Sequence, residues 1–204
     1  MNRIIVNNRT TVDGMFAGPN GELDWFMPDI ELDSYVFGPS GKEQPTTVLF
    51  GRTTYDMFAS YWPKVNSGEM QLDFLPDESL RQHERDIAAL LTNLKKVVVT
   101  SKDDDLGWQN VERLEGDLPA AIQKLKETSD GDIIIFGSGS IIATLEKAGL
   151  IDDYWLQVTP VVIGSGKSMF AGDTQQNLNL VESKVSSQGG VMVHYTPKAD
   201  SSSI

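Results

Sequence analysis

Three short segments of the chain combine glycine, hydroxyl and basic residues in patterns suited to binding phosphate. The first, Gly137-Ser138-Gly139-Ser140, follows the apolar run 133–136, and Ile141 then opens a helical pattern. Glycine lets the backbone approach a ligand closely, and the first N–H groups of a helix attract an anion. The other two are Gly51-Arg52-Thr53-Thr54 and Thr100-Ser101-Lys102, each at the end of a predicted strand. Together they offer N–H, hydroxyl and cationic groups to a phosphorylated dinucleotide.

Each segment alone also has an explanation that involves no ligand. The glycine segment could be a tight connection, Thr53 or Thr54 could cap a helix, and Ser101 and Lys102 could be solvated loop residues. The dinucleotide interpretation requires the three segments to lie together. Parallel strands satisfy that requirement, because their carboxyl ends share the edge of the sheet where ligands bind in open α/β folds.

The pattern of apolar residues predicts strands that alternate with helices, and therefore a largely parallel sheet covered on both faces. Strands are expected at 3–8, 46–50, 96–100, 110–114, 132–136 and 154–160, with a closing hairpin over 179–196. Helices are expected at 29–36, from 52 to a stop at Trp62-Pro63, and at 78–93, 117–126 and 141–147, with a surface excursion over 64–76. The sequence thus predicts a single α/β domain over 1–197 and a flexible tail over 198–204.

Composition excludes several classes of protein. The chain has 204 residues and a formal net charge of −12, which argues against binding nucleic acid, because that requires a basic face. It has no cysteine and two histidines, so we expect no disulfide and no metal site. No apolar stretch reaches transmembrane length, and the N-terminus runs straight into a strand pattern. We therefore expect a cytoplasmic protein without a membrane partner.

Two other nucleotide-binding motifs do not fit. Gly164-Ser165-Gly166-Lys167-Ser168 contains the end of a P-loop, but the glycine that the motif needs earlier is Val161. A Gly-x-Gly-x-x-Gly fingerprint starting at Gly137 would need a third glycine where the chain has Ile142.

An ordered set of short motifs resembles the dihydrofolate reductase fold. The nearest branch is the C-terminal reductase domain of the bifunctional riboflavin-biosynthesis deaminase/reductase, with its stand-alone relatives. The matching segments are Thr11-Val12-Asp13-Gly14, Ala17-Gly18, Gly21-Glu22-Leu23-Asp24-Trp25, Gly51-Arg52-Thr53-Thr54-Tyr55, Tyr61-Trp62-Pro63, Val98-Val99-Thr100-Ser101-Lys102, Gly137-Ser138-Gly139-Ser140, Leu150-Ile151-Asp152-Asp153 and Pro160-Val161-Val162-Ile163-Gly164-Ser165-Gly166. The resemblance implies a three-layer α/β/α fold with a mostly parallel mixed sheet and a C-terminal antiparallel hairpin.

The resemblance also implies NADPH as hydride donor. Arg52 and Ser101, with Lys102 nearby, match the positions that hold the adenosine 2′-phosphate. Residues 137–141 match the turn that cradles the pyrophosphate. Residues 13–25 match a mobile loop that covers the nicotinamide. The implied cofactor set is Gly51, Arg52, Thr53, Thr54, Thr100, Ser101, Lys102, Gly137, Ser138, Gly139, Ser140 and Ile141.

The substrate half of the resemblance is less complete. Asn7, Thr11 and Trp25 are the expected substrate contacts, and Asp13 and Asp33 are the candidate proton donors, although Asp13 also suits a turn before a glycine. The carboxylate that follows the Trp-x-x-Pro pattern of dihydrofolate reductases is Ile30 here. The Ala-Asp-Asp-Pro stretch usual in the riboflavin-pathway reductases is replaced by Gly51-Arg52-Thr53-Thr54.

We therefore expect an NADPH-dependent reductase of a small heterocycle that resembles 5-amino-6-(5-phosphoribosylamino)uracil reductase and forms a homodimer. A dihydrofolate or pterin reductase and a non-catalytic NADPH-binding module are the alternatives.

Overall fold

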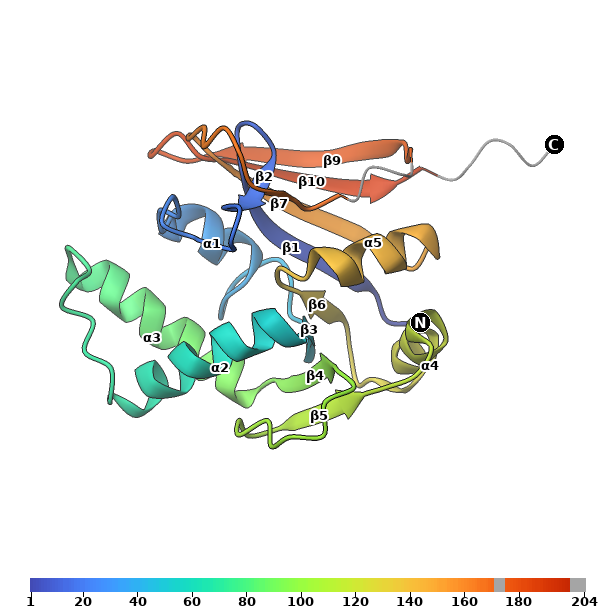
Figure 1. Ribbon diagram of the computed structural model, residues 1–204. Helices are drawn as coiled ribbons and strands as arrows, with labels where there is room; N and C mark the ends of the chain where they lie inside the picture. Colours follow the sequence, from blue (N-terminus) through green and yellow to red (C-terminus); the bar gives the residue numbers. More distant parts are fainter. Residues whose placement is uncertain (171–174, 199–204) are drawn as a thin grey trace.

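An eight-stranded sheet forms the centre of the fold, which we describe from a computed structural model over residues 1–170 and 175–198 (Figure 1). The strands are β1 (Ile4–Thr11), β2 (Met15–Ala17), β3 (Thr47–Gly51), β4 (Lys95–Val99), β5 (Val111–Leu114), β6 (Ile133–Ile135), β7 (Asp153–Thr159), β8 (Lys167–Ser168), β9 (Leu178–Val185) and β10 (Val191–Pro197). The helices are α1 (Ile30–Val36), α2 (Arg52–Ser67), α3 (Glu78–Asn93), α4 (Leu118–Thr128) and α5 (Gly139–Lys147). Apart from Lys198, the predicted tail lies outside the described residues.

The order of strands in the sheet is β5-β4-β3-β6-β1-β7-β10-β9, and β2 pairs separately with β8. The first six strands of this order are parallel, whereas β10 is antiparallel to both β7 and β9. The predicted α/β fold with a mostly parallel sheet and a closing antiparallel hairpin is therefore confirmed. None of the helices in the described residues is long and apolar enough to cross a bilayer.

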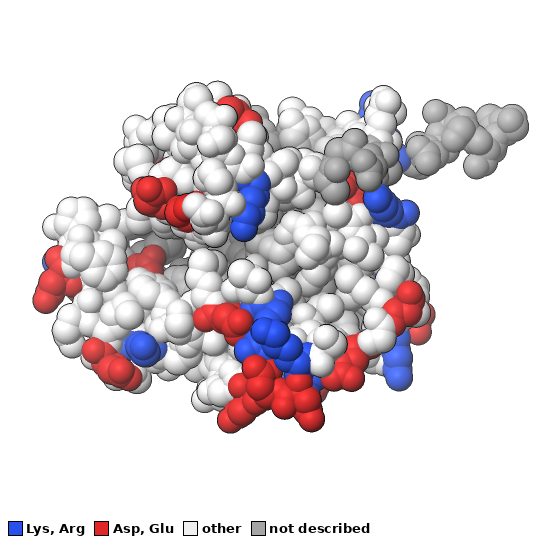
Figure 2. Space-filling model, viewed as in Figure 1, with Lys and Arg blue, Asp and Glu red and all other residues white. Residues whose placement is uncertain are grey.

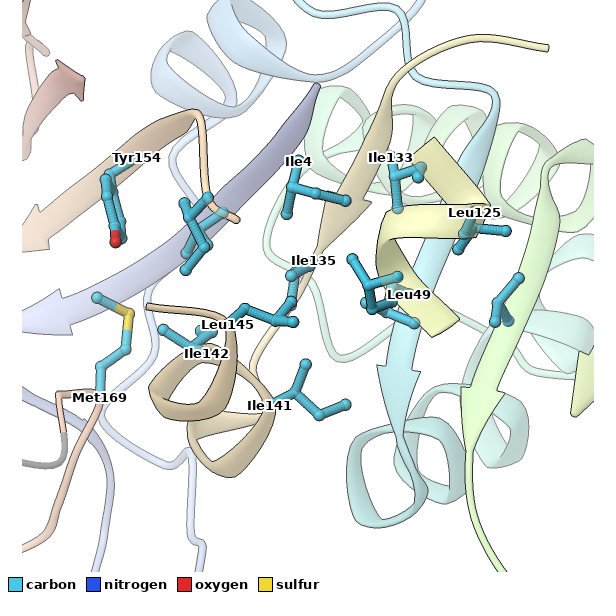
Figure 3. Close-up of a cluster of buried hydrophobic side chains, with 14 residues drawn as sticks. Ile4, Leu49, Leu125, Ile133, Ile135, Ile141, Ile142, Leu145, Tyr154 and Met169 are labelled. Atoms are coloured by element: carbon cyan, nitrogen blue, oxygen red, sulfur yellow. The ribbon is translucent and has the colours of Figure 1, made fainter. Parts of the chain in front are cut away.

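Two apolar cores lie on opposite faces of the sheet, because alternate strand residues point to opposite sides. On β1, Ile4 and Val6 pack with α4 and α5, whereas Ile5 packs with α1 and α3. Figure 3 shows the first core, in which Ile141, Ile142 and Leu145 of α5 face the strand residues. These contacts fix α5 against the sheet and thereby fix the turn that precedes it.

The sequence prediction that α2 stops at Trp62-Pro63 is wrong, because the helix continues to Ser67 with Pro63 inside it. Proline removes one helical hydrogen bond and normally ends a helix. Here the last turn brings Val65 into a third apolar cluster with Leu72, Leu75 and Ala88, so that part of the expected surface excursion is buried. The packing of this last turn against the third cluster outweighs the tendency of Pro63 to end the helix.

Lys96 on β4 is fully buried and ties the end of α3 to the sheet. Its Nζ donates to the carbonyl oxygens of Leu91 (3.0 Å), Thr92 (2.8 Å) and Leu94 (2.7 Å). It also lies 4.6 Å from the ring centre of Trp108. Burial lowers the pKa of Lys96 to about 8, so the ammonium group is still charged at neutral pH. Its donors are thus matched to carbonyls that the helix end leaves unpaired.

We expect Lys96→Met to lower the free energy of unfolding by roughly 2–4 kcal/mol, because it leaves buried carbonyls without donors. Urea unfolding followed by circular dichroism measures the loss. Lys95→Met is the matched control, since the Lys95 side chain is 42% exposed and pairs with Glu112 at the surface. Equal stability of the two variants would contradict a structural role for the buried ammonium.

Candidate functional site

The three phosphate-binding segments predicted from the sequence lie side by side at one edge of the sheet. Strands β4, β3 and β6 are neighbours and run parallel, so their carboxyl ends point the same way. Thr100 follows β4, Arg52 follows β3 and Gly137 follows β6. The parallel topology therefore brings together residues separated by up to 85 positions in sequence, which is 137 minus 52.

The β6–α5 turn has a backbone that glycine makes possible. Gly137 and Ser138 both have left-handed conformations, with φ of +61° and +58°. Ser138 Oγ accepts a hydrogen bond from the N–H of Gly51 (2.7 Å) and lies 3.2 Å from the hydroxyl of Thr54. The side chains of Ser138 and Thr54 thus fasten the two junctions together, which leaves the backbone N–H groups at the start of α5 as the groups available to a ligand.

Asn8 anchors this turn from β1. Asn8 was not singled out from the sequence; the neighbouring Asn7 was named instead, as a substrate contact. The Oδ1 of Asn8 accepts the N–H of Gly137 (2.5 Å), and its Nδ2 lies 3.0 Å from the sulfur of Met169. Only 6% of Asn8 is exposed. The alternation of β1 could have revealed it, because Asn8 follows Ile4 and Val6 on the face that α5 covers. Asn7 is only half-buried, and its predicted substrate role stays a prediction.

Arg52 already has two carboxylate partners. Its Nη1 donates to Asp104 (2.5 Å), and its Nε donates to Asp56 (2.7 Å). The hydrogen bonds that Arg52 donates to Asp104 and then to Asp56 raise the pKa of Arg52 above its usual value. Figure 2 shows the resulting mixture of positive and negative side chains on this face. An anionic ligand that binds Nη1 of Arg52 would therefore compete with Asp104.

Ser101 and Lys102 lie in the exposed loop after β4. The N–H of Lys102 donates to the hydroxyl of Thr100 (3.1 Å), which shapes the start of this loop. Further along, Arg113 binds Asp103 (2.6 Å) through its side chain. The loop thus carries one exposed cation beside a run of acids, and the phosphate-binding role of its residues stays a prediction.

Asp13 and Thr11 hold the turn after β1. Thr11 Oγ1 donates to Asp13 (2.6 Å), and the other oxygen of Asp13 accepts the N–H of Gly164 (2.8 Å). The hydrogen bond from Thr11, followed by that from Gly164, lowers the pKa of Asp13. The carboxylate therefore connects the β1–β2 turn to the segment after β7, and it is ionised at neutral pH.

Asp33 lies on α1 and has different partners from Asp13. It forms an ion pair with Arg9, and its Oδ2 lies 3.5 Å from Nε2 of His83 on α3. Burial works against ionisation of Asp33, but the charge of Arg9 and the contact with His83 outweigh it and lower the pKa. Neither candidate proton donor is therefore protonated at neutral pH in this structure. Arg9 and His83 were not identified from the sequence, because their contacts join separate elements.

The predicted mobile loop, 13–25, contains β2, and β2 is held by its pairing with β8. Trp25 in this loop is buried, and its indole Nε1 has no acceptor among the described residues. Phe26 places its ring 3.9 Å from the guanidinium carbon of Arg9. The loop thus covers the α1 side of the candidate site.

Comparisons with known proteins agree on the family and the fold. The family model described as RibD C-terminal domain matches residues 2–193. The uncharacterized protein YyaP of Bacillus subtilis (strain 168) is 30% identical over 194 residues, which cover 95% of this chain and 94% of YyaP.

Solved structures with low sequence identity have the same fold. A proposed riboflavin biosynthesis protein from Shewanella sp. PV-4 has a TM-score of 0.65 at 20% identity and covers 98% of this chain and 100% of its own. RibD of Acinetobacter baumannii gives 0.65 at 16% identity, covering 98% of this chain and 59% of RibD. Dihydrofolate reductase from Enterococcus faecalis, complexed with NADP(H) and RAB-propyl, gives 0.60 at 16%, covering 97% of each chain.

Proposed function

The chain belongs to the RibD C-terminal domain family, a family of reductase domains, and we propose that it is an NADPH-dependent reductase of a small heterocyclic substrate. The proposed reaction resembles that of 5-amino-6-(5-phosphoribosylamino)uracil reductase. The observation that carries the proposal is the turn before α5, which Asn8 and Gly51 hold with its backbone N–H groups at the shared edge of the sheet.

The residues at this edge fit a phosphorylated dinucleotide. A side chain at Gly137 would place its Cβ 3.0 Å from Thr54 Oγ1, so the packing at this turn leaves no room for a side chain. The start of α5 adds the partial positive charge of a helix N-terminus. Arg52 offers a guanidinium that can bind phosphate through two N–H groups, in competition with Asp104 at Nη1. The glycine turn and the start of α5 would hold the pyrophosphate, and Arg52 would hold the 2′-phosphate.

When bound, NADPH would supply the hydride, and the chain would bind and orient both reactants. The proton that accompanies the hydride requires another source, because the carboxyl groups of Asp13 and Asp33 both have lowered pKa values. Either carboxylate could still accept a hydrogen bond from a water molecule or from the substrate. We therefore propose that Asp13 and Asp33 orient groups at the site, and that protons reach the substrate from water.

Arg52→Ala is expected to weaken NADPH binding roughly 10- to 150-fold and to leave NADH binding nearly unchanged, because only NADPH carries the 2′-phosphate. Asp104→Asn should act in the opposite direction and tighten NADPH binding, since it removes the competing carboxylate. Titration calorimetry with both cofactors measures these changes. Equal losses for NADPH and NADH in Arg52→Ala would remove Arg52 from this role.

The activity itself is tested by following NADPH oxidation with a panel of pyrimidine, pterin and carbonyl compounds. We expect turnover with a ribosylaminopyrimidine or a related planar heterocycle. A protein that binds NADPH but oxidises it with none of these compounds would instead be the non-catalytic binding module. The panel therefore separates the enzyme from a cofactor sensor.

A further inference from the structure

Arg9 on β1 is the centre of a cluster of polar side chains that plays no part in the proposed phosphate site. Its Nε donates to Oε1 of Gln157 (3.2 Å), and its Nη2 donates to Asp33. Asp33 also contacts His83, so the cluster joins β1, β7, α1 and α3. Because successive strand residues point to opposite faces, Arg9 lies on the other face of β1 from Asn8, which holds the glycine turn.

One nitrogen of Arg9 has no partner. Its Nη1 is buried and makes no hydrogen bond with any residue that the structure describes. A guanidinium is always charged and offers its donors in a rigid, planar arrangement. Since Asp33 binds Nη2 and Gln157 binds Nε, the planar group is held and Nη1 has a fixed direction. A buried donor without an acceptor is unfavourable, so this position favours a ligand that brings an acceptor.

Phe26 covers the flat face of the same guanidinium, with its ring centre 3.9 Å from Cζ. The residue is 39% exposed and belongs to the loop between β2 and α1. Stacking on a guanidinium is available to any planar aromatic ring. Figure 2 shows the surface hollowed between the part of the molecule that contains α1 and the part that contains α2 and α3. Movement of Phe26 would therefore leave a place for another ring beside Nη1.

This place adjoins the proposed cofactor edge. Arg9 directly follows Asn8, which binds Gly137 at the start of the phosphate-binding turn. Both residues lie near the carboxyl end of β1, between β6 and β7 in the sheet. A ring stacked on Arg9 would thus lie at the same height along β1 as Asn8, but on the opposite face of the sheet.

We propose that Arg9 recognises the substrate of this reductase, and that the substrate is a planar heterocycle carrying a carbonyl oxygen. The ring takes the place of Phe26 against the guanidinium, and the carbonyl oxygen accepts a hydrogen bond from Nη1. Asp33 and Gln157 keep the guanidinium in position. This inference rests on the proposed function, because it assumes that the reacting ring meets the cofactor at this edge.

The test uses 5-aminouracil as the probe and titration calorimetry on the full chain saturated with NADPH. Wild-type protein should bind the probe, and Arg9→Lys should weaken the binding about 10- to 100-fold. Lysine keeps the positive charge but lacks the rigid set of N–H donors and the planar surface on which a ring can stack. The matched control is Arg85→Lys on α3, where Arg85 pairs with Glu78 at the surface and should have no effect. Unchanged binding in a folded Arg9→Lys variant would overturn the proposal.

Phe26→Ala provides a test that does not depend on the stability of the Arg9 variant. Removing the competing ring should tighten binding of 5-aminouracil about 2- to 5-fold. Phe170→Ala is the control, because Phe170 is similarly exposed at 37% and packs near Tyr154 instead. Equal or weaker binding in Phe26→Ala would contradict the proposal, as would a wild-type protein that fails to bind the probe at millimolar concentration.

Substrate recognition by Arg9 and reductase function are overturned by different results. If the protein binds NADPH, but neither Arg9→Lys nor Phe26→Ala changes its affinity for 5-aminouracil, only the proposed role of Arg9 is overturned. A protein that does not bind NADPH at all would overturn the proposed function.

Discussion

Gly137→Val is expected to lower the affinity for NADPH by about 100-fold or more, because two backbone N–H contacts to phosphate at about 1.5 kcal/mol each would be lost. The Cβ would lie 3.0 Å from Oγ1 and 3.1 Å from Cγ2 of Thr54, at a residue with φ of +61°. A β-branched residue is strained in that conformation. The variant should therefore also unfold at a lower temperature than the wild-type protein.

Gly139→Val separates the effect on the cofactor from the effect on the fold. Gly139 has no left-handed backbone, and a Cβ there would lie 3.4 Å from the ring of Phe16, close to ordinary contact. This variant should largely keep its thermal stability and still lose NADPH affinity, since the added side chain crowds the start of α5. Calorimetric titration and thermal unfolding measure the two quantities. If Gly139→Val unfolds like the wild-type protein and binds NADPH normally, the phosphate site lies elsewhere.

Dihydrofolate is expected to be a poor substrate, with turnover slower than that of a dedicated enzyme by about 10²- to 10⁴-fold, the usual contribution of a positioned acid. The resemblance to dihydrofolate reductases predicts that the position of that acid is Ile30, the first residue of α1. The neighbouring Asp29 cannot take its place, because it accepts the N–H of Leu32 (3.2 Å) and the hydroxyl of Ser186 (2.5 Å). Asp33 is held as a carboxylate by Arg9 and His83.

Steady-state NADPH oxidation with dihydrofolate and with a ribosylaminopyrimidine, for wild type and Ile30→Asp, measures this difference. A gain of dihydrofolate reduction in Ile30→Asp would support the missing acid as the cause. Ile30→Asn is the matched control, because the asparagine side chain has a shape similar to that of aspartate but no acidic group. Fast reduction of dihydrofolate by the wild-type protein would contradict the prediction and favour a folate or pterin reductase.

The mostly parallel character of the sheet and its closing hairpin could be predicted from the sequence, because they depend on local patterns, whereas the order of the strands could not. Apolar runs of strand length followed by glycine and then by helical spacing predict parallel strands, and parallel strands bring their ends together. The end of α2 was mispredicted, since the packing of Val65 in the last turn depends on Leu72 and Leu75 beyond it.

The partners of the functional side chains were harder to predict. Asp56 lies four residues after Arg52, a spacing that indicates a pair on a helix, but nothing local points to Asp104. The contact of Asn8 with Gly137 and that of Arg9 with Asp33 join elements far apart in sequence. Such contacts exist only once the sheet has formed, so the sequence indicated the candidate residues without their partners.

Calorimetric titration of the wild-type protein with NADPH and with NADH tests the central claim most directly. We expect saturable binding of one NADPH per chain, tighter than that of NADH because Arg52 can bind the 2′-phosphate. Absence of NADPH binding, or equal affinity for the two cofactors, would contradict it.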